Sequence, residues 1–278
     1  MTKSSITIGA VLATLLTLAA CGGGGGSSVT TSSSSTPTPA PRPTPAPTPA
    51  PRPTPAPTPT PTPSPAPAPS AQYQGVHLTA GSNQAHTAHA QAYNSNTLNE
   101  IQVGSRTVTV KYPGISSGTF GTFNTRNQNV TSSDGLLSYS RFGVYFGADK
   151  TDAEIANGSR STQTNKVFSM GQVTTNMPTT GTAVYNGRSL GSSTGNVYGE
   201  GTSRFNVDFG AKTISGTVSN SAYSADLRGT ISGASFSGAH NGVNMSGNFY
   251  GPNAAELGGV YNGTSNGRSV VGSFGAKR

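Results

Sequence analysis

Residues 235–250 read SFSGAHNGVNMSGNFY, which is the pattern of two short strands around one tight turn. The pair Asn241-Gly242 favours a type I′ turn, because both central residues of that turn take positive φ. A two-residue turn there places Phe236 opposite Gly247 and gathers the apolar side chains of both halves on one face. Pattern and turn therefore predict the same hairpin register.

The same alternation of short strand and turn continues on both sides of this hairpin. In residues 204–209 apolar and polar side chains alternate, as a half-buried strand requires. The expected strands are Val167–Val173, Thr182–Tyr185, Ser203–Phe209, Thr213–Ser219, Ala225–Ser232, Ser235–His240, Val243–Tyr250, Leu257–Tyr261 and Ser269–Phe274. Hairpin spacing of this kind predicts an up-and-down barrel or a sandwich. Glycines inside the strands favour the barrel, because they relieve crowding where a small barrel curves: Gly216, Gly238, Gly247 and Gly272.

Upstream the signals are weaker but still mainly β. Arg106–Tyr112 and Leu137–Phe146 have the composition of strands. A short helix is expected over Asp149–Ala156, where Thr151 is the N-cap and Glu154 completes a capping box.

The N-terminus has the features of an export leader. A basic start is followed by an apolar run, Ile6–Ala20, which is the size of a signal-peptide core. It ends in Leu18-Ala19-Ala20-Cys21, which resembles a bacterial lipobox. Residues 1–20 are therefore expected to be a lipoprotein signal peptide, and Cys21, the single cysteine, is the expected lipidation site.

Residues 21–70 are expected to be a disordered linker. Glycine and serine dominate up to Ser35, and alternating proline follows from Thr36 to Pro69. Alternating proline favours extended polyproline II, which would reach about 100 Å over this tract. We interpret the tract as a stalk.

Charge and composition exclude several classes of function. The net charge of +8 is spread over the chain without a Lys/Arg run, so nucleic-acid binding is not expected. A lone cysteine provides neither a disulfide nor a thiolate metal site. No nucleophile elbow or HExxH motif is present, so the chain is expected to be a binding protein and not an enzyme, with no catalytic residues and no metal.

Histidines and tyrosines are the remaining candidates for ligand binding. His86 and His89 are three residues apart and would bind haem or a transition metal if they shared a helical face; the alternative is two solvated histidines in a polar loop. His77 is expected to be solvated, and His240 is expected at a hairpin rim. Three tyrosines expected at the surface would anchor a partner: Tyr185, Tyr198 and Tyr261.

The end of the chain carries a more specific signal. Residues 248–261 read NFYGPNAAELGGVY, and residues 271–277 read VGSFGAK. These two segments resemble the closing motif of transferrin-binding-protein-B-like barrels. In that family the Phe-Tyr-Gly ends a strand, Pro-Asn-Ala-Ala-Glu makes a helical turn that includes Glu256, and the two last strands close the barrel.

The resemblance implies a mainly β fold. A small eight-stranded antiparallel barrel over residues 166–278 would follow a β-rich handle domain over residues 71–165. It also implies an outer-membrane lipoprotein on the surface of a Gram-negative bacterium, exported with the help of an outer-membrane translocator. Its expected partner is a host serum protein or glycan, as in iron acquisition, complement-regulator binding or glycosaminoglycan binding, with the protein acting as a monomer.

Two alternatives stay open beside that function. The handle would capture haem through His86 and His89, or the chain is a structural surface protein.

Overall fold

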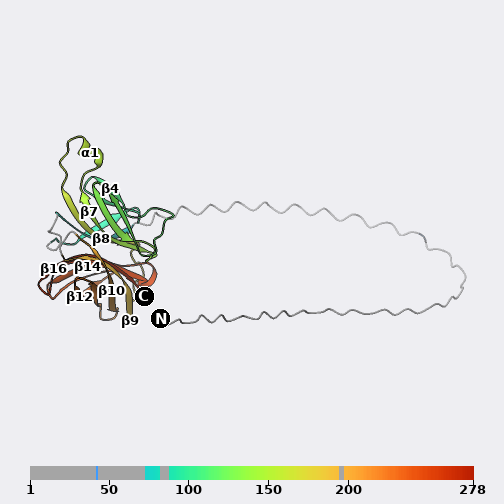
Figure 1. Ribbon diagram of the computed structural model, residues 1–278. Coiled ribbons are helices and arrows are strands. Elements are labelled where there is room, and N and C mark those ends of the chain that lie inside the picture. The colour runs from blue at the N-terminus through green and yellow to red at the C-terminus, as the bar shows by residue number, and fades with distance from the viewer. Residues whose placement is uncertain (1–41, 43–72, 82–87, 194–196) are drawn as a thin grey trace, which may run out of the picture. The chain divides into compact units, whose positions relative to one another are not determined.

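A six-stranded antiparallel sheet and a closed eight-stranded barrel follow one another along the chain (Figure 1). The structure, a computed structural model, describes residues 42, 73–81, 88–193 and 197–278. The leader, Cys21, nearly all of the linker and His86 lie outside the described residues. Residues 1–64 and 65–278 are separate units, and both β-structures belong to the second.

The six-stranded sheet has the order β2-β1-β8-β7-β6-β5, with a separate β3–β4 hairpin against one face. Its strands and the one α-helix among the described residues are β1 Tyr73–Gly81, β2 Gln91–Ser95, β3 Glu100–Val103, β4 Arg106–Thr109, β5 Phe120–Thr125, β6 Gln128–Ser133, β7 Ser140–Ala148, α1 Asp152–Ala156 and β8 Gln163–Gly171. The strand expected over Arg106–Tyr112 is thus β4, and the strand expected over Leu137–Phe146 is β7.

The barrel closes through the pairing of β16 with β9. Its elements are β9 Thr182–Ser192, β10 Gly199–Asp208, β11 Thr213–Asn220, β12 Ser224–Ser232, β13 Ser235–His240, β14 Val243–Tyr250, the 3₁₀ turn η2 Pro252–Ala254, β15 Glu256–Ser265 and β16 Arg268–Lys277. The mainly β fold with a C-terminal eight-stranded antiparallel barrel is confirmed.

The strand expected over Val167–Val173 forms as β8, but it is not part of the barrel. It pairs with β1 on one side and with β7 on the other, and the barrel begins only at Thr182. The boundary expected at residue 166 is therefore too early. A run of apolar residues reports that a strand is buried, and it does not report which sheet buries it.

The hairpin of residues 235–250 has the predicted register, with Phe236 opposite Gly247 and His240 opposite Val243. Asn241 and Gly242 both take positive φ, 48° and 81°, as a type I′ turn requires.

Glycines in the barrel strands make room for aromatic rings across the strand pair. Phe205 lies opposite Gly216, and a Cβ on this glycine would be 2.3 Å from the ring. Phe236 is opposite Gly247 in the same way, and Tyr261 is opposite Gly272. Gly238 differs, because its Cβ would meet the backbone of β12. The glycines therefore serve ring packing in the barrel core as well as curvature.

The sheet and the outer wall of the barrel share a second apolar core. Leu78, Phe142 and Val144 of the sheet pack with Leu190 and Val260 of the barrel. The opposite face of the sheet is covered by β3 and β4. The central strands β7 and β8 are thus buried on both faces, and the exposed positions of the sheet are mainly on its outer strands and at its ends.

The closing motif forms nearly as expected. The 3₁₀ turn follows Gly251, and β15 and β16 are the last two strands of the barrel. Glu256 is the exception: it is the first residue of β15 and lies buried beneath the start of β7.

No helix in the described part of the chain is long and apolar enough to cross a membrane.

Candidate functional site

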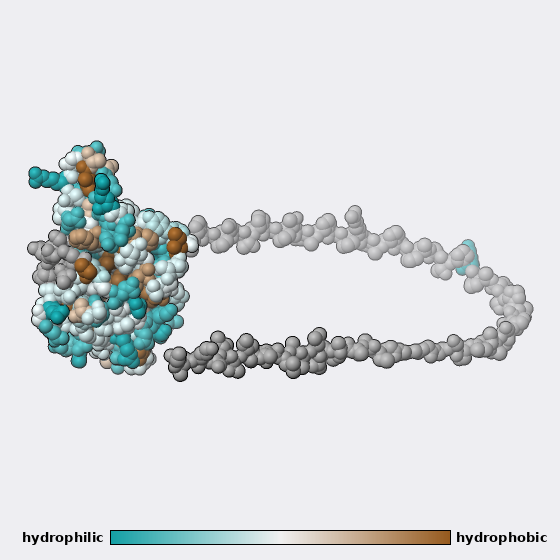
Figure 2. All heavy atoms as spheres, viewed as in Figure 1, coloured by the Kyte–Doolittle hydropathy of each residue, from teal (hydrophilic) through white to brown (hydrophobic). Residues whose placement is uncertain are grey.

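The connection from β7 to β8 forms an extension that projects beyond the end of the sheet and carries α1 (Figure 1). In Figure 2 this extension stands out from the rest of the folded part, with hydrophilic residues around small hydrophobic spots. None of the residues of α1 is buried, and residues 157–162 are all exposed. The extension therefore adds nothing to the apolar core, unlike every strand of the sheet.

A capping box holds the start of α1. Thr151 Oγ1 accepts a hydrogen bond from the backbone N–H of Glu154, and the Glu154 carboxylate accepts one from the backbone N–H of Thr151. Ser105 in the β3–β4 turn also donates to Glu154 Oε2, at 2.5 Å. The hydrogen bonds from Ser105 and Thr151 lower the pKa of Glu154 to about 2. The predicted capping box is confirmed.

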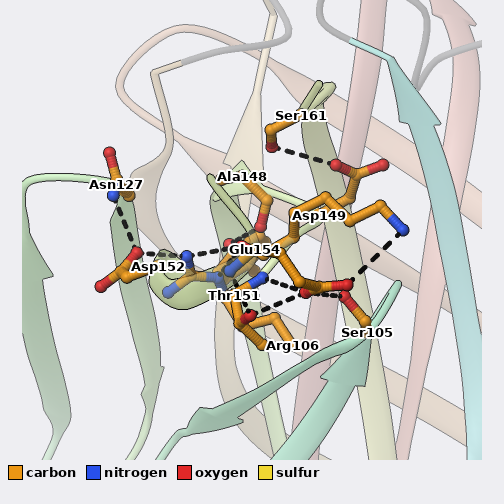
Figure 3. Close-up of polar contacts among 11 residues, drawn as sticks. Ser105, Arg106, Asn127, Ala148, Asp149, Thr151, Asp152, Glu154 and Ser161 are labelled. Atoms are coloured by element: carbon orange, nitrogen blue, oxygen red, sulfur yellow. Dashed lines mark hydrogen bonds and ion pairs between the residues drawn. The ribbon is translucent and has the colours of Figure 1, made fainter. Parts of the chain in front are cut away.

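Arg106, the first residue of β4, is the centre of this polar network (Figure 3). Arg106 is 7% exposed, and its guanidinium donates twice to the carbonyl of Lys150, at 2.9 and 2.6 Å. It also forms an ion pair with Asp152 Oδ1 at 2.5 Å, and Asn127 in the β5–β6 turn donates to the same oxygen. Hydrogen bonding to Arg106 holds the pKa of Asp152 below its usual range.

Asp149 fixes the base of the extension. Its side chain accepts hydrogen bonds from Ser161 and from the backbone of Thr162, and its carbonyl accepts one from Ser105 N (Figure 3). Gly104 has φ +60°, and a Cβ there would lie 2.2 Å from the Asp149 carbonyl, so only glycine allows this approach. We call the residues of this network the α1 cluster: Ser105, Arg106, Asn127, Asp149, Lys150, Thr151, Asp152, Glu154 and Ser161.

The acids of the α1 cluster form hydrogen bonds and ion pairs within the cluster, whereas two arginines in neighbouring loops are exposed. Arg126, beside Asn127, and Arg160, in the loop after α1, are both exposed. Neither forms an ion pair with a described residue. Ile155 between them in sequence is only partly buried. Arginine and partly exposed apolar side chains on a rigid support are typical of protein-binding surfaces.

A second exposed surface lies at the other end of the sheet, in the loop between β4 and β5. Tyr112 is 48% exposed and Ile115 is 61% exposed. The loop is fixed from below by Lys111 and Ser117, which both contact the buried carboxylate of Asp134.

The histidines expected to bind ligands are not brought together in the described residues. His86 lies outside them, and His89 is exposed in an extended segment before β2, where no helix forms. His77 is partly buried in β1 with its ring edge against Tyr93, so the expectation that it is solvated is wrong. Burial, with a smaller effect of Lys166, lowers the pKa of His77 to about 4. His240 ends β13 at the hairpin rim, as expected.

Two of the three tyrosines proposed as surface anchors are in the barrel core. Tyr185 is fully buried and Tyr261 is 1% exposed, while Tyr198 is partly buried and donates to Asn165. Tyr185 and Tyr261 are inward-facing positions of barrel strands, and the valine before each of them left the inward face undecided in the sequence. Among the described residues, no group of three or more His, Cys, Asp or Glu side chains is placed to hold a metal ion.

No motif in the sequence predicts the exposed surfaces. The capping box predicts α1, but whether a short helix packs on the core or projects from it depends on contacts with β4 and the β5–β6 turn, which are distant in sequence. Arg126 and Arg160 stand in polar segments without a motif.

Comparison with known proteins identifies the barrel. Residues 177–278 match the family model for the C-lobe and N-lobe β-barrels of transferrin-binding protein B. An uncharacterised protein of Haemophilus influenzae is 32% identical over 197 residues, which cover 65% of this chain and 66% of the relative.

Solved structures share the fold. Transferrin-binding protein B of serogroup B Neisseria meningitidis is 20% identical with a TM-score of 0.53, over 74% of this chain and 43% of that protein. The corresponding vaccine antigen of Haemophilus parasuis is 20% identical with a TM-score of 0.51, over 74% and 45%. The chain thus spans less than half the length of these two proteins. The barrel of this chain therefore belongs to the family of transferrin-binding protein B barrels, and the sheet in front of it shares the fold of these proteins.

Proposed function

We propose that this chain is a surface lipoprotein that binds a host macromolecule through the α1 end of its six-stranded sheet. The observation that carries the proposal is that α1 and the loop after it contribute no residue to the buried apolar cores, yet a dense polar network holds them in place. A connection between two antiparallel neighbours needs only a few residues. Extra residues that are ordered without serving the core are best explained by an interaction.

The chemistry of this end favours a protein as the ligand. The guanidinium groups of Arg126 and Arg160 are free to pair with carboxylates of a partner, and bidentate pairing of this kind is strong and directional. Two of the three acids of the α1 cluster, Asp152 and Glu154, form ion pairs with Arg106 and Lys150, which offset the repulsion of an acidic partner by these carboxylates. Family members include proteins that bind host transferrin, which supports a host iron-carrying protein as the partner to test first.

The tether is the second part of the proposal. Cys21 would carry the lipid, and residues 22–70 would connect it to β1 as a spacer at the outer surface of a Gram-negative cell. The sequence Leu18-Ala19-Ala20-Cys21 and the alternating prolines support this arrangement. The likeness of the barrel to the transferrin-binding protein B barrels supports export by an outer-membrane translocator as part of the same proposal.

The experiment is capture from host serum by the acyl-free chain with Cys21→Ser, followed by mass spectrometry of what is retained. The double variant Arg126→Glu with Arg160→Glu should lose the captured protein. The control is Arg204→Glu with Arg228→Glu, two exposed arginines on β10 and β12 of the barrel. The proposal would be contradicted if the host protein were still captured by the Arg126→Glu, Arg160→Glu variant but not by the Arg204→Glu, Arg228→Glu variant.

A further inference from the structure

A groove of about 400 Å³ lies between the sheet and the barrel, well separated from the α1 cluster. One wall is the start of β1 together with β2, and the other wall comes from β12, β13 and β14. Tyr73 at the start of β1 pairs with Ser95, whereas the α1 extension lies at the opposite end of the sheet, beyond Ala148 of β7. The volume is within the range of small-ligand sites.

None of the described residues that line this groove is charged. Its walls carry side-chain amides, among them Gln91, Asn94 and Asn248, and hydroxyls, among them Thr230, Ser237 and Ser246. Several of these groups are exposed, including Gln91, Asn94 and Ser237. Amides and hydroxyls donate and accept hydrogen bonds at the same time, so the groove offers a mixed, neutral hydrogen-bonding surface.

Asn248 shows that this surface is not fully satisfied from within the protein. Its Nδ2 donates to Ser235 Oγ at 3.0 Å, but its Oδ1 is buried and has no hydrogen-bond partner among the described residues. An unpaired buried acceptor costs free energy, which a hydrogen bond from a ligand would recover. A rotation of the amide toward the groove would let a ligand hydroxyl donate to this oxygen.

We propose that the groove binds a neutral oligosaccharide. A sugar presents hydroxyls that both donate and accept, which matches the amides and hydroxyls of both walls. A sulfated or carboxylated glycan would lose hydration of its charge and find no cationic partner among the lining residues. The inference is independent of the protein ligand proposed above, because none of the lining residues belongs to the α1 cluster.

An extended peptide is the competing occupant, since β2 is an edge strand of the sheet. Strand addition takes its specificity from pockets that accept alternate side chains of the peptide. The apolar residues that line this groove do not form such pockets: Phe236 is 2% exposed and Tyr93 is 9% exposed. The polar walls favour the sugar.

The test has two stages. The acyl-free full chain is first screened for binding to a panel of neutral oligosaccharides. Saturation-transfer NMR is then recorded with the oligosaccharides that bind and, in every case, with the neutral tetrasaccharide lacto-N-neotetraose. A heparin-derived tetrasaccharide and an alanine/threonine pentapeptide are run beside them. Ser237→Trp fills the groove from β13 and should weaken sugar binding at least about tenfold, equivalent to about 1.4 kcal/mol. Asn248→Ala should also weaken it.

Matched controls are Ser215→Trp on β11 and Asn244→Ala on β14, both exposed and neither lining this groove. They should leave the affinity within about twofold, which is below about 0.5 kcal/mol. Three outcomes would overturn the inference: no neutral glycan binds, only the heparin fragment or the peptide binds, or sugar binding is unaffected by Ser237→Trp. Serum capture by the α1 end is measured separately, so loss of one activity does not imply loss of the other.

Discussion

Ser140 Oγ at the start of β7 donates a 2.8 Å hydrogen bond to the carboxylate of Glu256 at the start of β15. The backbone N–H groups of Ser138 and Tyr139 donate to the same carboxylate, at 2.5 and 3.1 Å. Glu256 is 3% exposed and forms no ion pair with a described residue. One buried side chain therefore ties the loop before β7 to the barrel by three hydrogen bonds.

Glu256→Gln is expected to lower the free energy of unfolding by about 1–3 kcal/mol, because the NH₂ group of the new amide would face the N–H and O–H donors that now bind the carboxylate. Urea unfolding followed by circular dichroism measures the change. The control is Glu200→Gln, since Glu200 is half exposed in a surface ion pair with Arg188 and should cost less than about 1 kcal/mol. Equal losses in both variants would show that the buried carboxylate is not a special contact.

The barrel core gives a second prediction. Gly216→Ala would place a Cβ 2.3 Å from the Phe205 ring and 2.4 Å from the Arg204 carbonyl, so overpacking should cost about 1–3 kcal/mol. Gly210→Ala is the control, because its Cβ would meet only Asp208 Oδ1 at 3.5 Å. Thermal unfolding distinguishes them, and a Gly216→Ala protein as stable as the control would disprove the ring-over-glycine packing.

His77 makes stability depend on pH. Its pKa is about 4 in the folded chain against 6.5 for a free histidine, so between these values the unfolded chain binds more protons. The free energy of unfolding should therefore fall as the pH is lowered from 6.5 to 4. His77→Phe, which keeps a ring against Tyr93, should remove this part of the decline, and His89→Gln at an exposed site should not. The idea fails if wild type and His77→Phe lose stability in parallel over that range.

Lipidation of Cys21 is tested on the mature protein. Mass spectrometry of the N-terminal peptide is expected to show removal of residues 1–20 and a diacylglyceryl group on Cys21, as the lipobox-like sequence indicates. A diacylglyceryl group supplies two acyl chains, and one chain alone would anchor the protein only marginally. Cys21→Ser should leave the protein without lipid. An unmodified Cys21 in protein purified from the cell envelope would contradict the tether.

Much of the barrel can be predicted because its order is local. Each strand from β10 to β16 pairs with the next along the chain, and turns such as Asn241-Gly242 fix the register within a few residues. The motif at residues 248–261 adds the closing turn.

The sheet in front of the barrel could not be predicted to the same extent. Its order depends on pairs such as Val76 with Ser169 in β1 and β8, which no turn connects. The bond between Ser140 and Glu256 spans 116 residues and has no local signal, whereas the local motif by itself predicts Glu256 in a helical turn. The candidate surfaces were missed for the same reason: the contacts of Arg106 with α1 span more than 40 residues.

The central claim is that the α1 extension serves binding and not folding. Asp149 N donates to the Thr162 carbonyl directly beyond the pair of Ala148 with Gln163, so the ladder of β7 and β8 reaches these residues. Replacing residues 150–161 by Asn-Gly would therefore connect Asp149 to Thr162, and thus β7 to β8, by a two-residue hairpin turn. The replacement would also expose Arg106 to water.

The most direct measurement is serum capture by this shortened chain, together with its thermal unfolding. The account predicts that the captured host protein is lost while the chain still unfolds cooperatively, with a midpoint within a few degrees of wild type. A shortened chain that retains the same host protein with unchanged affinity would contradict it.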